Sequence, residues 1–428
     1  MPTRRPLSAY PTSASWLAQF DLVDRPKAAN MLDSMLLLNE EQVSAAIRSQ
    51  LYVIADGRRG KRRRIALYAE REFGGSPAFD TQLVPDRTGR LRRRAVGWNG
   101  PAAVKPSRGG VRVGSEGLIA FVISQAQKTR SKVFATHPGP DRIRGKTAPT
   151  GTIAIVTDFI GSGSRVRDVL DAFWAVPSVR SWASHYLIDF MVIAASATVA
   201  GAANVRQHRT RPEVTFRHVA PTIRSHPDWQ RSFEWLDLLE RYGPDAGRGT
   251  GRFGFGGAAA LVAFNYRLPN NTPALVHQSA TGWRALYDGA APDDLRPAFG
   301  LQSQAEIIGR AAEDAGIEFA ADLPSHDAAL VLVLSLLRGR WRKGAEVALA
   351  ERSGMAVPDI FDILMKALKD GYVTGSGRLT DAGQALLTAG RRTERKRPTI
   401  PTNPEPYYPL ALRTPRDSSS TRRPSGRP

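Results

Sequence analysis

Apolar residues recur along residues 118–220 in two alternating patterns, short apolar runs and helical spacing. The runs are typical of strands buried on both faces, and one further segment alternates apolar and polar residues. The predicted strands are 132–135, 153–156, 187–194 and 213–219. Apolar residues three or four positions apart predict helices at 118–126, before the first strand, and at 165–173. The small residues at 196–205 predict a further helix that can pack closely on a sheet. This alternation predicts an α/β domain with a mainly parallel sheet flanked by helices.

The chain opens with helical patterns rather than with a strand. Apolar residues follow helical spacing over 15–20 and 26–37, and a third helix is predicted over 40–51. Asn39 would cap this third helix, and Gln42 three residues later completes a capping-box-like pattern. A helical prelude is therefore expected before the sheet.

A long connection without a clear pattern covers residues 74–114, which are rich in Gly, Pro and Arg. Long irregular loops of this kind tend to be functional or mobile. The connection holds a basic cluster at 90–94, and another basic cluster at 58–64 precedes it. The cluster at 58–64 is either a solvated loop or a contact to nucleic acid phosphates.

A second domain of helices follows residue 325. Its predicted elements are helices at 327–337, 344–352 and 358–370, a hairpin over 371–380, and a closing helix from Thr380. This order resembles a winged helix-turn-helix domain, with 358–369 as its recognition helix. That helix carries cations only at Lys366 and Lys369, and it begins with Asp359 and Asp362. Because the N-terminal residues of a recognition helix meet base edges, both a DNA partner and a protein partner stay open.

These patterns divide the chain into five segments. They are a disordered basic N-terminus at 1–13, the α/β domain with its helical prelude at 14–290, a linker at 291–325 with one helix near 303–315, the winged domain at 326–390, and a disordered basic tail at 391–428.

Composition narrows the classes of function. A hydrophobic content of 42% fits a globular core, and the absence of cysteine excludes disulfides, thiolate catalysis and cysteine-based zinc sites. The formal net charge of +20 suggests a polyanionic partner or an anionic substrate. No apolar run approaches the ~20 residues of a membrane span, and the first residues do not resemble a signal peptide. We therefore expect a cytoplasmic protein without a membrane partner.

The clearest chemical signal is the stretch 152–165, which reads T-I-A-I-V-T-D-F-I-G-S-G-S-R. It predicts a strand, a turn of small residues at 161–164, and a helix, with the turn where α/β sheets place their ligands. Backbone N–H groups of the turn, the hydroxyls of Ser162 and Ser164, and the helix N-terminus would favour an anion. Asp158 would repel phosphate and instead suits a sugar diol or a cation. An ordinary strand-to-helix turn is the alternative.

A second glycine-rich loop lies at 249–257 and is followed by a turn at 268–273. Gly254, Gly256 and Ala259 fit G-x-G-x-x-A, but neither a preceding strand nor a later acid supports a dinucleotide site. The loop is therefore either part of the active site or a flexible connector. As part of the site, its candidate residues are Gly254, Gly256, Gly257, Asn270 and Asn271.

The stretch 152–165 resembles the phosphoribosyltransferase signature, in which an apolar strand leads into two acids and a Thr/Ser-Gly loop. The resemblance implies phosphoribosyl pyrophosphate (PRPP) as the ligand. Thr157 and Asp158 would hold the ribose, with Asp158 in the catalytic role, and Thr157 stands where the family has its first acid. The 5′-phosphate would be bound by Gly161, Ser162, Gly163, Ser164 and Arg165. Mg²⁺ would arrive with PRPP, and no protein metal site is predicted.

Several ordered motifs together resemble one divergent phosphoribosyltransferase-like family of prokaryotic conflict systems, the PRTase-CE type. The motifs are 16–21, 114–117, 157–163, 253–257 and 269–272 followed by Trp283, and the resemblance covers about 14–290. It implies a PRPP-like or nucleotide-like ligand and a role as an effector or sensor in antiviral defence.

Three functions follow from these patterns and from the resemblance. The first is an enzyme that transfers a ribosyl-phosphate group from PRPP, or that cleaves a related ribosyl bond, with magnesium. It would be a pentosyl-type glycosyltransferase with a degenerate acidic pair. The second is a non-catalytic regulator that binds the ligand and acts on DNA or a protein through the winged helix. The third is a plain nucleic-acid-binding protein, which the positive charge allows.

Overall fold

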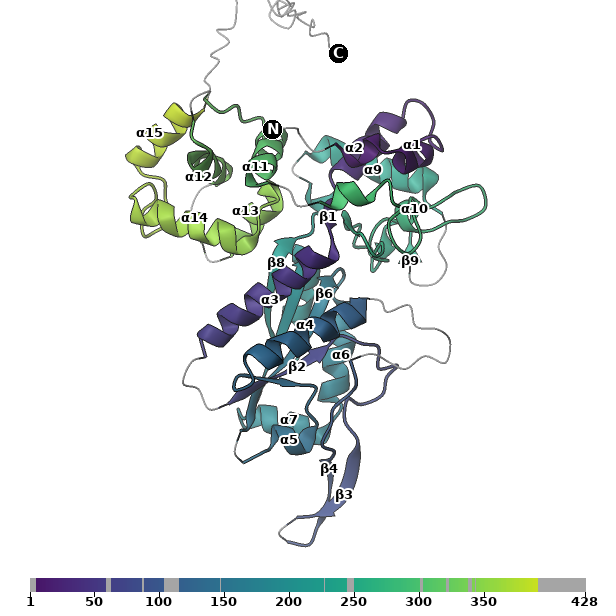
Figure 1. The fold of residues 1–428 in the computed structure, drawn as a ribbon, viewed down its shortest axis with the longest axis vertical. Coiled ribbons are helices and arrows are strands. Elements are labelled where there is room, and N and C mark those ends of the chain that lie inside the picture. The colour runs from purple at the N-terminus through teal and green to yellow at the C-terminus, as the bar shows by residue number, and fades with distance from the viewer. Residues whose placement is uncertain are drawn as a thin grey trace, which may run out of the picture.

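The computed structural model describes residues 5–58, 63–86, 88–103, 115–146, 148–226, 228–244, 250–300, 303–320, 323–337, 341–342 and 344–391. Three parts are visible in Figure 1: a central sheet body, an upper lobe that joins N-terminal helices to residues 229–300, and a winged domain at the C-terminal end.

Five parallel strands form the sheet body, in the order β5-β2-β6-β7-β8. Their bounds are β5 Phe134–Thr136, β2 Arg64–Ala69, β6 Thr150–Ile160, β7 Asp189–Ala197 and β8 Glu213–Val219. Every residue of the central strand β6 is buried, as its apolar run requires when both faces are covered. The predicted parallel α/β architecture is therefore confirmed.

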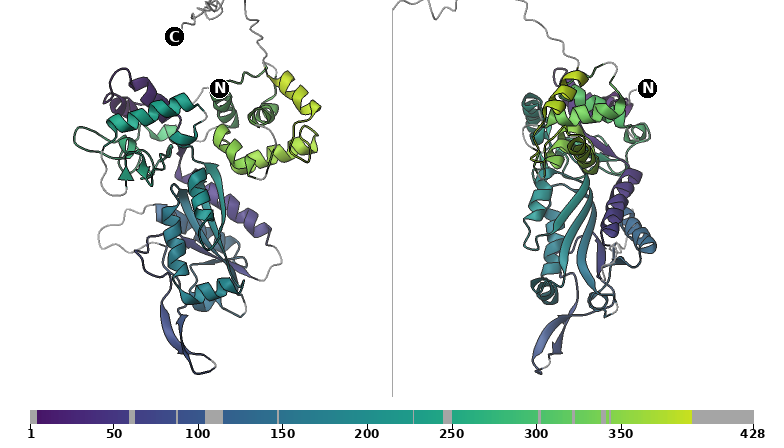
Figure 2. Two further views of the ribbon diagram at one scale, coloured as in Figure 1. Left: turned by 180° about the vertical axis from the view of Figure 1, so that it is seen from behind. Right: turned by 90° about the vertical axis from the view of Figure 1, so that its left-hand side faces the viewer.

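Helices cover both faces of this sheet (Figure 2). Helices α3 and α4 pack on one face, and α6, α7 and α8 lie on the other. Their bounds are α3 Glu40–Asp56, α4 Ser115–Thr129, α6 Ser164–Trp174, α7 Pro177–Ser184 and α8 Val199–Arg206, with the short α5 at Pro140–Ile143. The Asn39 amide accepts from Gln42 N–H, and Gln42 accepts from Asn39 N–H, so the predicted capping box is present.

The upper lobe joins two stretches that are far apart in the sequence. Its elements are η1 Leu7–Ala9, α1 Pro11–Leu17, α2 Arg25–Asp33, β1 Leu36–Leu38, η2 Ile223–Ser225, α9 Trp229–Tyr242, β9 Thr250–Gly251, β10 Gly254–Phe255, β11 Val262–Phe264, α10 Ala274–His277 and η3 Arg296–Phe299. An aromatic cluster holds it together, in which Trp16 and Phe20 meet Tyr242 and Trp283 edge-on or tilted. The Trp16 indole donates to Leu275 O at 3.1 Å.

Strands β1 and β11 pair in parallel and form the seam between the lobe and the sheet body. Alternate side chains of the seam enter different cores. Leu38 and Phe264 pack with the sheet body, whereas Leu37 and Ala263 pack with the lobe. The helix predicted over 26–37 is therefore wrong at its end, because three consecutive leucines also suit a strand between two cores.

The prediction of a disordered N-terminus over 1–13 is wrong for the residues from 5 onwards. Leu7 and Tyr10 are buried in the lobe, and the Thr12 hydroxyl and N–H both donate to Asp294 at 2.8 Å. Residues 1–4 lie outside the described part.

Part of the connection predicted over 74–114 is a regular hairpin. Strands β3 (Thr81–Pro85) and β4 (Leu91–Ala95) pair antiparallel and project from the far end of the sheet body (Figure 1). The pattern did not predict it, because both faces are largely exposed and therefore polar and apolar positions do not alternate.

The winged domain contains the predicted helices. They are α12 Ser325–Leu336, α13 Ala345–Ser353, α14 Val357–Lys369 and α15 Asp381–Gly390, and an antiparallel bridge joins Val373 to Leu379 at the predicted hairpin. The helix predicted near 303–315 is present as α11 (Gln304–Asp314). It is not part of a loose linker, because it buries Ile308, Ala311 and Ala312 against this domain. The tail predicted from 391 lies outside the described residues from 392 onwards.

The winged domain packs against the edge of the sheet body. Ile360 and Leu364 of α14 belong to the same continuous cluster of buried residues as Val214 and Phe216 of β8. At the surface of this contact, Arg217 of β8 pairs with Asp359 at 3.2 Å. The N-terminal end of the predicted recognition helix therefore lies at an interface within the chain.

None of the helices in the described ranges has both the length and the apolar character needed to cross a membrane.

Candidate functional site

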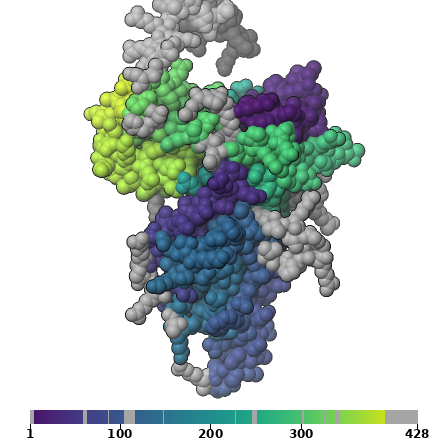
Figure 3. All heavy atoms as spheres, in the orientation of Figure 1, coloured from purple at the N-terminus to yellow at the C-terminus, as the bar shows by residue number. Residues whose placement is uncertain are grey.

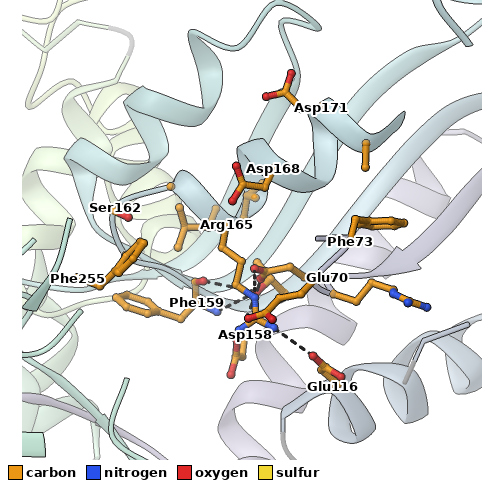
Figure 4. A pocket seen from close by; sticks show the side chains of 18 of the residues that line it. Glu70, Phe73, Glu116, Asp158, Phe159, Ser162, Arg165, Asp168, Asp171 and Phe255 are labelled. Atoms are coloured by element: carbon orange, nitrogen blue, oxygen red, sulfur yellow. Dashed lines mark hydrogen bonds and ion pairs between the residues drawn. The ribbon is translucent and has the colours of Figure 1, made fainter. Parts of the chain in front are cut away.

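A cavity of about 900 Å³ opens where β2 and β6 end (Figure 4). Three segments form most of its wall: 70–76 after β2, 157–163 at the end of β6 and in the turn after it, and 268–271 from the upper lobe. Because parallel strands end at one edge of the sheet, side chains that follow neighbouring strands converge there.

Asp158 lies in this cavity with a side chain that is only slightly exposed. The Tyr266 hydroxyl donates to its Oδ2 at 3.0 Å, and the Arg267 guanidinium lies 3.6 Å from the same oxygen. Tyr266 and Arg267 both come from the upper lobe, immediately after β11. The lobe thus orients the carboxylate and partly compensates its charge, while its other oxygen, Oδ1, lies 3.4 Å from the Thr157 hydroxyl.

Sequence reasoning missed one buried acid of the cavity, Glu70. It follows β2 directly, and its N–H donates to Val156 O at 2.9 Å, which brings Glu70 beside Thr157. The Thr157 hydroxyl donates to Glu70 Oε2. The sequence did contain an indication of this acid. Glu70 follows an apolar run at 65–69, just as Asp158 follows the apolar run of the neighbouring strand.

Burial raises the pKa of the Glu70 carboxyl to about 7, although the nearby Arg165 guanidinium favours the charged form. Arg165 Nε lies 2.9 Å from Glu70 Oε1, and its NH2 group lies 3.1 Å from Glu116 Oε1 on α4. Arg165, predicted to bind phosphate, is thus paired with two carboxylates in the structure, as the dashed lines in Figure 4 show.

Side chains at the start of α8 and within it hydrogen-bond to the carbonyl groups of the predicted phosphate loop. The Thr198 hydroxyl donates to Gly161 O at 2.6 Å, and the Asn204 amide donates to Ser162 O at 2.8 Å. Gly163, at φ 83°, turns the chain into α6 and leaves this helix without a side-chain cap. The loop carbonyls are therefore engaged by the protein, and the positive end of α6 adjoins the cavity.

The second glycine-rich loop lies against the first one. Phe255, Asn270 and Asn271 line the cavity, and the Asn271 amide donates to Phe255 O at 2.9 Å. Gly254, Gly256 and Gly257 have positive φ, and a Cβ on Gly256 would crowd Ser162. The structure thus brings Asn270 and Asn271 to the candidate site, whereas the three glycines shape the loop without lining it.

Charges of both signs line the cavity. The acids are Glu70, Glu72, Glu116, Asp158, Asp168 and Asp171, and the arginines are Arg71, Arg165, Arg180, Arg209 and Arg267. Among the described residues, no group of three or more acids or histidines is arranged to hold a metal ion. The cavity does contain two neighbouring carboxylates, Glu70 and Asp158, and Mg²⁺ commonly binds through one or two carboxylates plus phosphates.

Comparison with known families divides the chain as the fold does. Residues 120–288 match the family described as PRTase-CE, and residues 331–414 match the family described as wHTH-PRTase associated. A comparison with curated proteins gives no match. The first matched region contains Asp158, the loop at 161–165 and the lobe residues that face them. Residues 120–288 are therefore similar to the PRTase-CE family, and residues 331–414 are similar to the family described as wHTH-PRTase associated.

Proposed function

We propose that the cavity binds PRPP, or a nucleotide with a similar ribose 5-phosphate. Asp158 would accept hydrogen bonds from the ribose hydroxyls, and the loop 161–165 would hold the 5′-phosphate. One observation carries the proposal: the Asp158 carboxylate and the uncapped N-terminus of α6 border one cavity. An acid suits the diol and a helix N-terminus suits the phosphate, so one ligand with both groups fits the pair.

Transfer of a ribosyl group passes through a state with positive charge on the sugar ring. The carboxylates of Asp158 and Glu70 would stabilise that charge, while the loop 161–165 fixes the phosphate end of the ligand. Mg²⁺, when bound with PRPP, would neutralise the pyrophosphate leaving group. The upper lobe holds Tyr266 and Arg267 against Asp158 and so positions this carboxylate before the ligand arrives.

Binding without turnover is the second candidate, and two observations favour it. Thr157 gives a hydroxyl where the signature has its first acid, and Arg165 is held by Glu70 and Glu116. A ligand that recruits Arg165 to its phosphate would break these pairs, and the winged domain would pass the change to DNA or to a protein partner.

Calorimetric titration with PRPP, with and without Mg²⁺, tests the proposal. Wild-type protein is expected to bind PRPP in the presence of Mg²⁺, and Asp158→Asn is expected to weaken binding at least tenfold. Asp293→Asn is the matched control, because Asp293 is an exposed acid outside the cavity. Release of pyrophosphate on addition of nucleobases or nucleosides would then separate the enzyme from the regulator. Equal titrations of wild-type protein and Asp158→Asn would contradict the proposal.

We also propose that the chain acts as an effector or sensor in a prokaryotic defence system. The association of a PRTase-CE domain with its winged helix-turn-helix domain supports this role. Phage plating efficiency on cells that express the wild-type chain is expected to fall, and Asp158→Asn is expected to restore it. Equal plating on wild-type and empty-vector cells would argue against a defence role for the chain alone.

A further inference from the structure

The geometry points to Glu70 as the second acid of the ribose-binding pair, in place of the carboxylate that position 157 lacks. This inference rests on the proposed function and names a further ligand-binding residue for the same cavity. The second carboxylate of the pair would thus stand at the end of β2 and not at the end of the neighbouring strand β6.

The strand register supports this substitution. Ala69 on β2 pairs with Val156 on β6, so the next residues, Glu70 and Thr157, lie side by side. An acid on Thr157 would enter the space that the Glu70 carboxylate occupies, because the Thr157 hydroxyl already contacts Glu70 Oε2. The two positions are therefore alternatives for a single carboxylate.

The remaining contacts of Glu70 also match a ligand-binding role. Its side chain is largely buried but lines the cavity, and the nearest cation, Arg165, is itself held partly by Glu116. Two largely buried carboxylates, Glu70 and Asp158, thus share one cavity, and the nearby arginines neutralise their negative charge only in part. A diol with a bound cation supplies the hydrogen-bond donors and the positive charge that this pair favours.

The inference is tested by removing the acid at position 70 and placing one at position 157. Calorimetry with PRPP and Mg²⁺ is run on wild-type protein, Glu70→Gln, and the double variant Glu70→Gln with Thr157→Asp. Glu70→Gln is expected to weaken binding at least tenfold, and the double variant is expected to recover most of the affinity. Rescue by an acid at 157 distinguishes a ligand-binding charge from a merely structural side chain.

The outcomes separate the two proposals. If wild-type protein binds PRPP, Asp158→Asn loses binding and Glu70→Gln keeps it, the Glu70 inference is overturned while the proposed function stands. If wild-type protein binds no PRPP, the proposed function itself fails.

Melting temperatures measured without ligand test the same inference even if a variant binds poorly because it folds poorly. Thr157→Asp alone places two carboxylates in contact, so it is expected to lower the melting temperature more in the wild-type background than in the Glu70→Gln background. Equal effects in both backgrounds would show that the two positions are not alternatives.

A separate observation concerns the β3–β4 hairpin, which stands clear of the sheet body (Figure 3). Arg90, Arg92, Arg93 and Arg94 are all exposed on it. Arg92 lies 3.3 Å from Asp86, and Arg94 is one of the cations that lower the pKa of the Asp141 carboxyl. Four arginines against these two acids leave the arm with an excess of positive charge.

The hairpin is anchored only at its base. Ala95 is buried and its N–H donates to the Ser178 hydroxyl at 2.8 Å, whereas Leu83 and Leu91 are 62% and 60% exposed. Near the base, Trp98 is 66% exposed with the Arg142 guanidinium over its ring. A two-stranded ribbon gains little stability by itself, so such an exposed one suits a contact with another molecule.

We infer that this arm binds duplex DNA. A two-stranded ribbon fits the major groove of B-form DNA, and guanidinium groups pair with its phosphates. The predicted recognition helix is less suited, because its N-terminal Asp359 is acidic and is held by Arg217 of the sheet body. The arm would thus provide the contact that the winged helix was expected to make.

Fluorescence anisotropy of the full chain with a labelled mixed-sequence duplex, over a range of salt concentrations, tests this inference. Changing Arg90, Arg93 and Arg94 together to Ala is expected to weaken binding at least tenfold. It should also reduce the slope of log affinity against log salt by about 3, since each lost phosphate contact removes about 0.9.

A variant with Lys366, Lys369 and Arg378 changed to Ala is the matched control, because it removes the same charge from the winged domain. It is expected to keep nearly the wild-type slope. Loss of binding in the control and not in the hairpin variant would overturn the inference and assign DNA to the winged domain. Unchanged binding in both variants would also overturn it.

Discussion

At the scale of single residues, Gly161 has no space for a side chain. A Cβ at this position would collide with the side-chain amide of Asn271, where the loop 161–165 meets the lobe. Gly161→Ala is therefore expected to push the two loops apart and to lower the free energy of unfolding by about 1–3 kcal/mol. Urea denaturation measures this loss.

The control for this change is Gly309→Ala, because Gly309 lies in α11 and a Cβ added there would meet no atom within 4 Å. Alanine at an open helical site is expected to be neutral or slightly stabilising. If Gly161→Ala unfolded at the wild-type urea concentration, the close contact between the two loops would be contradicted.

Glu70 predicts a pH dependence of stability. Its pKa rises from 4.5 to about 7 in the folded chain, mainly because of burial. The folded chain therefore binds this proton more tightly than the unfolded one, and the contribution to stability is present below pH 4.5 and lost as the pH rises to 7. Glu70→Gln should remove this slope.

Melting temperatures of wild-type protein and Glu70→Gln between pH 4.5 and 8 check this expectation. The difference between the two curves should change in favour of Glu70→Gln as the pH rises. Parallel curves over this range would show that Glu70 titrates at its ordinary value.

The sequence predicted some residues of the candidate site and missed others. Asp158 and the loop 161–165 belong to one contiguous stretch, so their spacing alone placed them at the end of one strand. Glu70 comes from another strand, and the pairing of β2 with β6 is a tertiary fact that no local pattern contains. The same limit applies to Arg165, whose two carboxylate partners come from separate elements.

At the scale of elements, the strands that local pattern predicted are those with at least one buried face. β6 and β7 were recognised because apolar residues dominate them, and β8 because apolar residues alternate with polar ones. The hairpin β3–β4 was missed because it packs on little, and β1 was taken for helix because its three leucines extend the preceding spacing. The sequence pattern therefore predicted which strands are buried, but it could not predict that β1 pairs with β11.

The β1–β11 seam gives a prediction at this scale. Leu38 is buried in the core of the sheet body, so Leu38→Ala should leave a cavity and lower the free energy of unfolding by about 2–5 kcal/mol. Leu22→Ala is the control, since Leu22 is 76% exposed and should change little. Comparable urea midpoints for both variants would contradict the seam.

At the scale of the whole molecule, the sheet body and the winged domain share one core. Ile360 of α14 is fully buried in the cluster that also holds Phe216 of β8. Ile360→Ala is therefore expected to shift the unfolding of the entire chain to lower temperature, rather than to release the winged domain alone. Scanning calorimetry distinguishes these cases.

A single transition that moves as a whole would support the shared core. A new transition at low temperature beside an unchanged main one would show that the winged domain unfolds by itself. Arg217→Ala is a useful companion, because the partly exposed pair with Asp359 should contribute no more than about 1 kcal/mol.

The pairing of β1 with β11 also determines when the protein can fold during its synthesis. Leu36 leaves the ribosome early, yet its partner Val262 is made more than two hundred residues later. At a translation rate of about 5–20 residues per second, this interval lasts roughly ten to forty-five seconds. Throughout it, Trp16, Phe20 and the leucines of β1 lack the part of their cover that Tyr242, Trp283 and β11 supply. The nascent N-terminal segment is therefore a natural substrate for chaperones that bind exposed apolar chain.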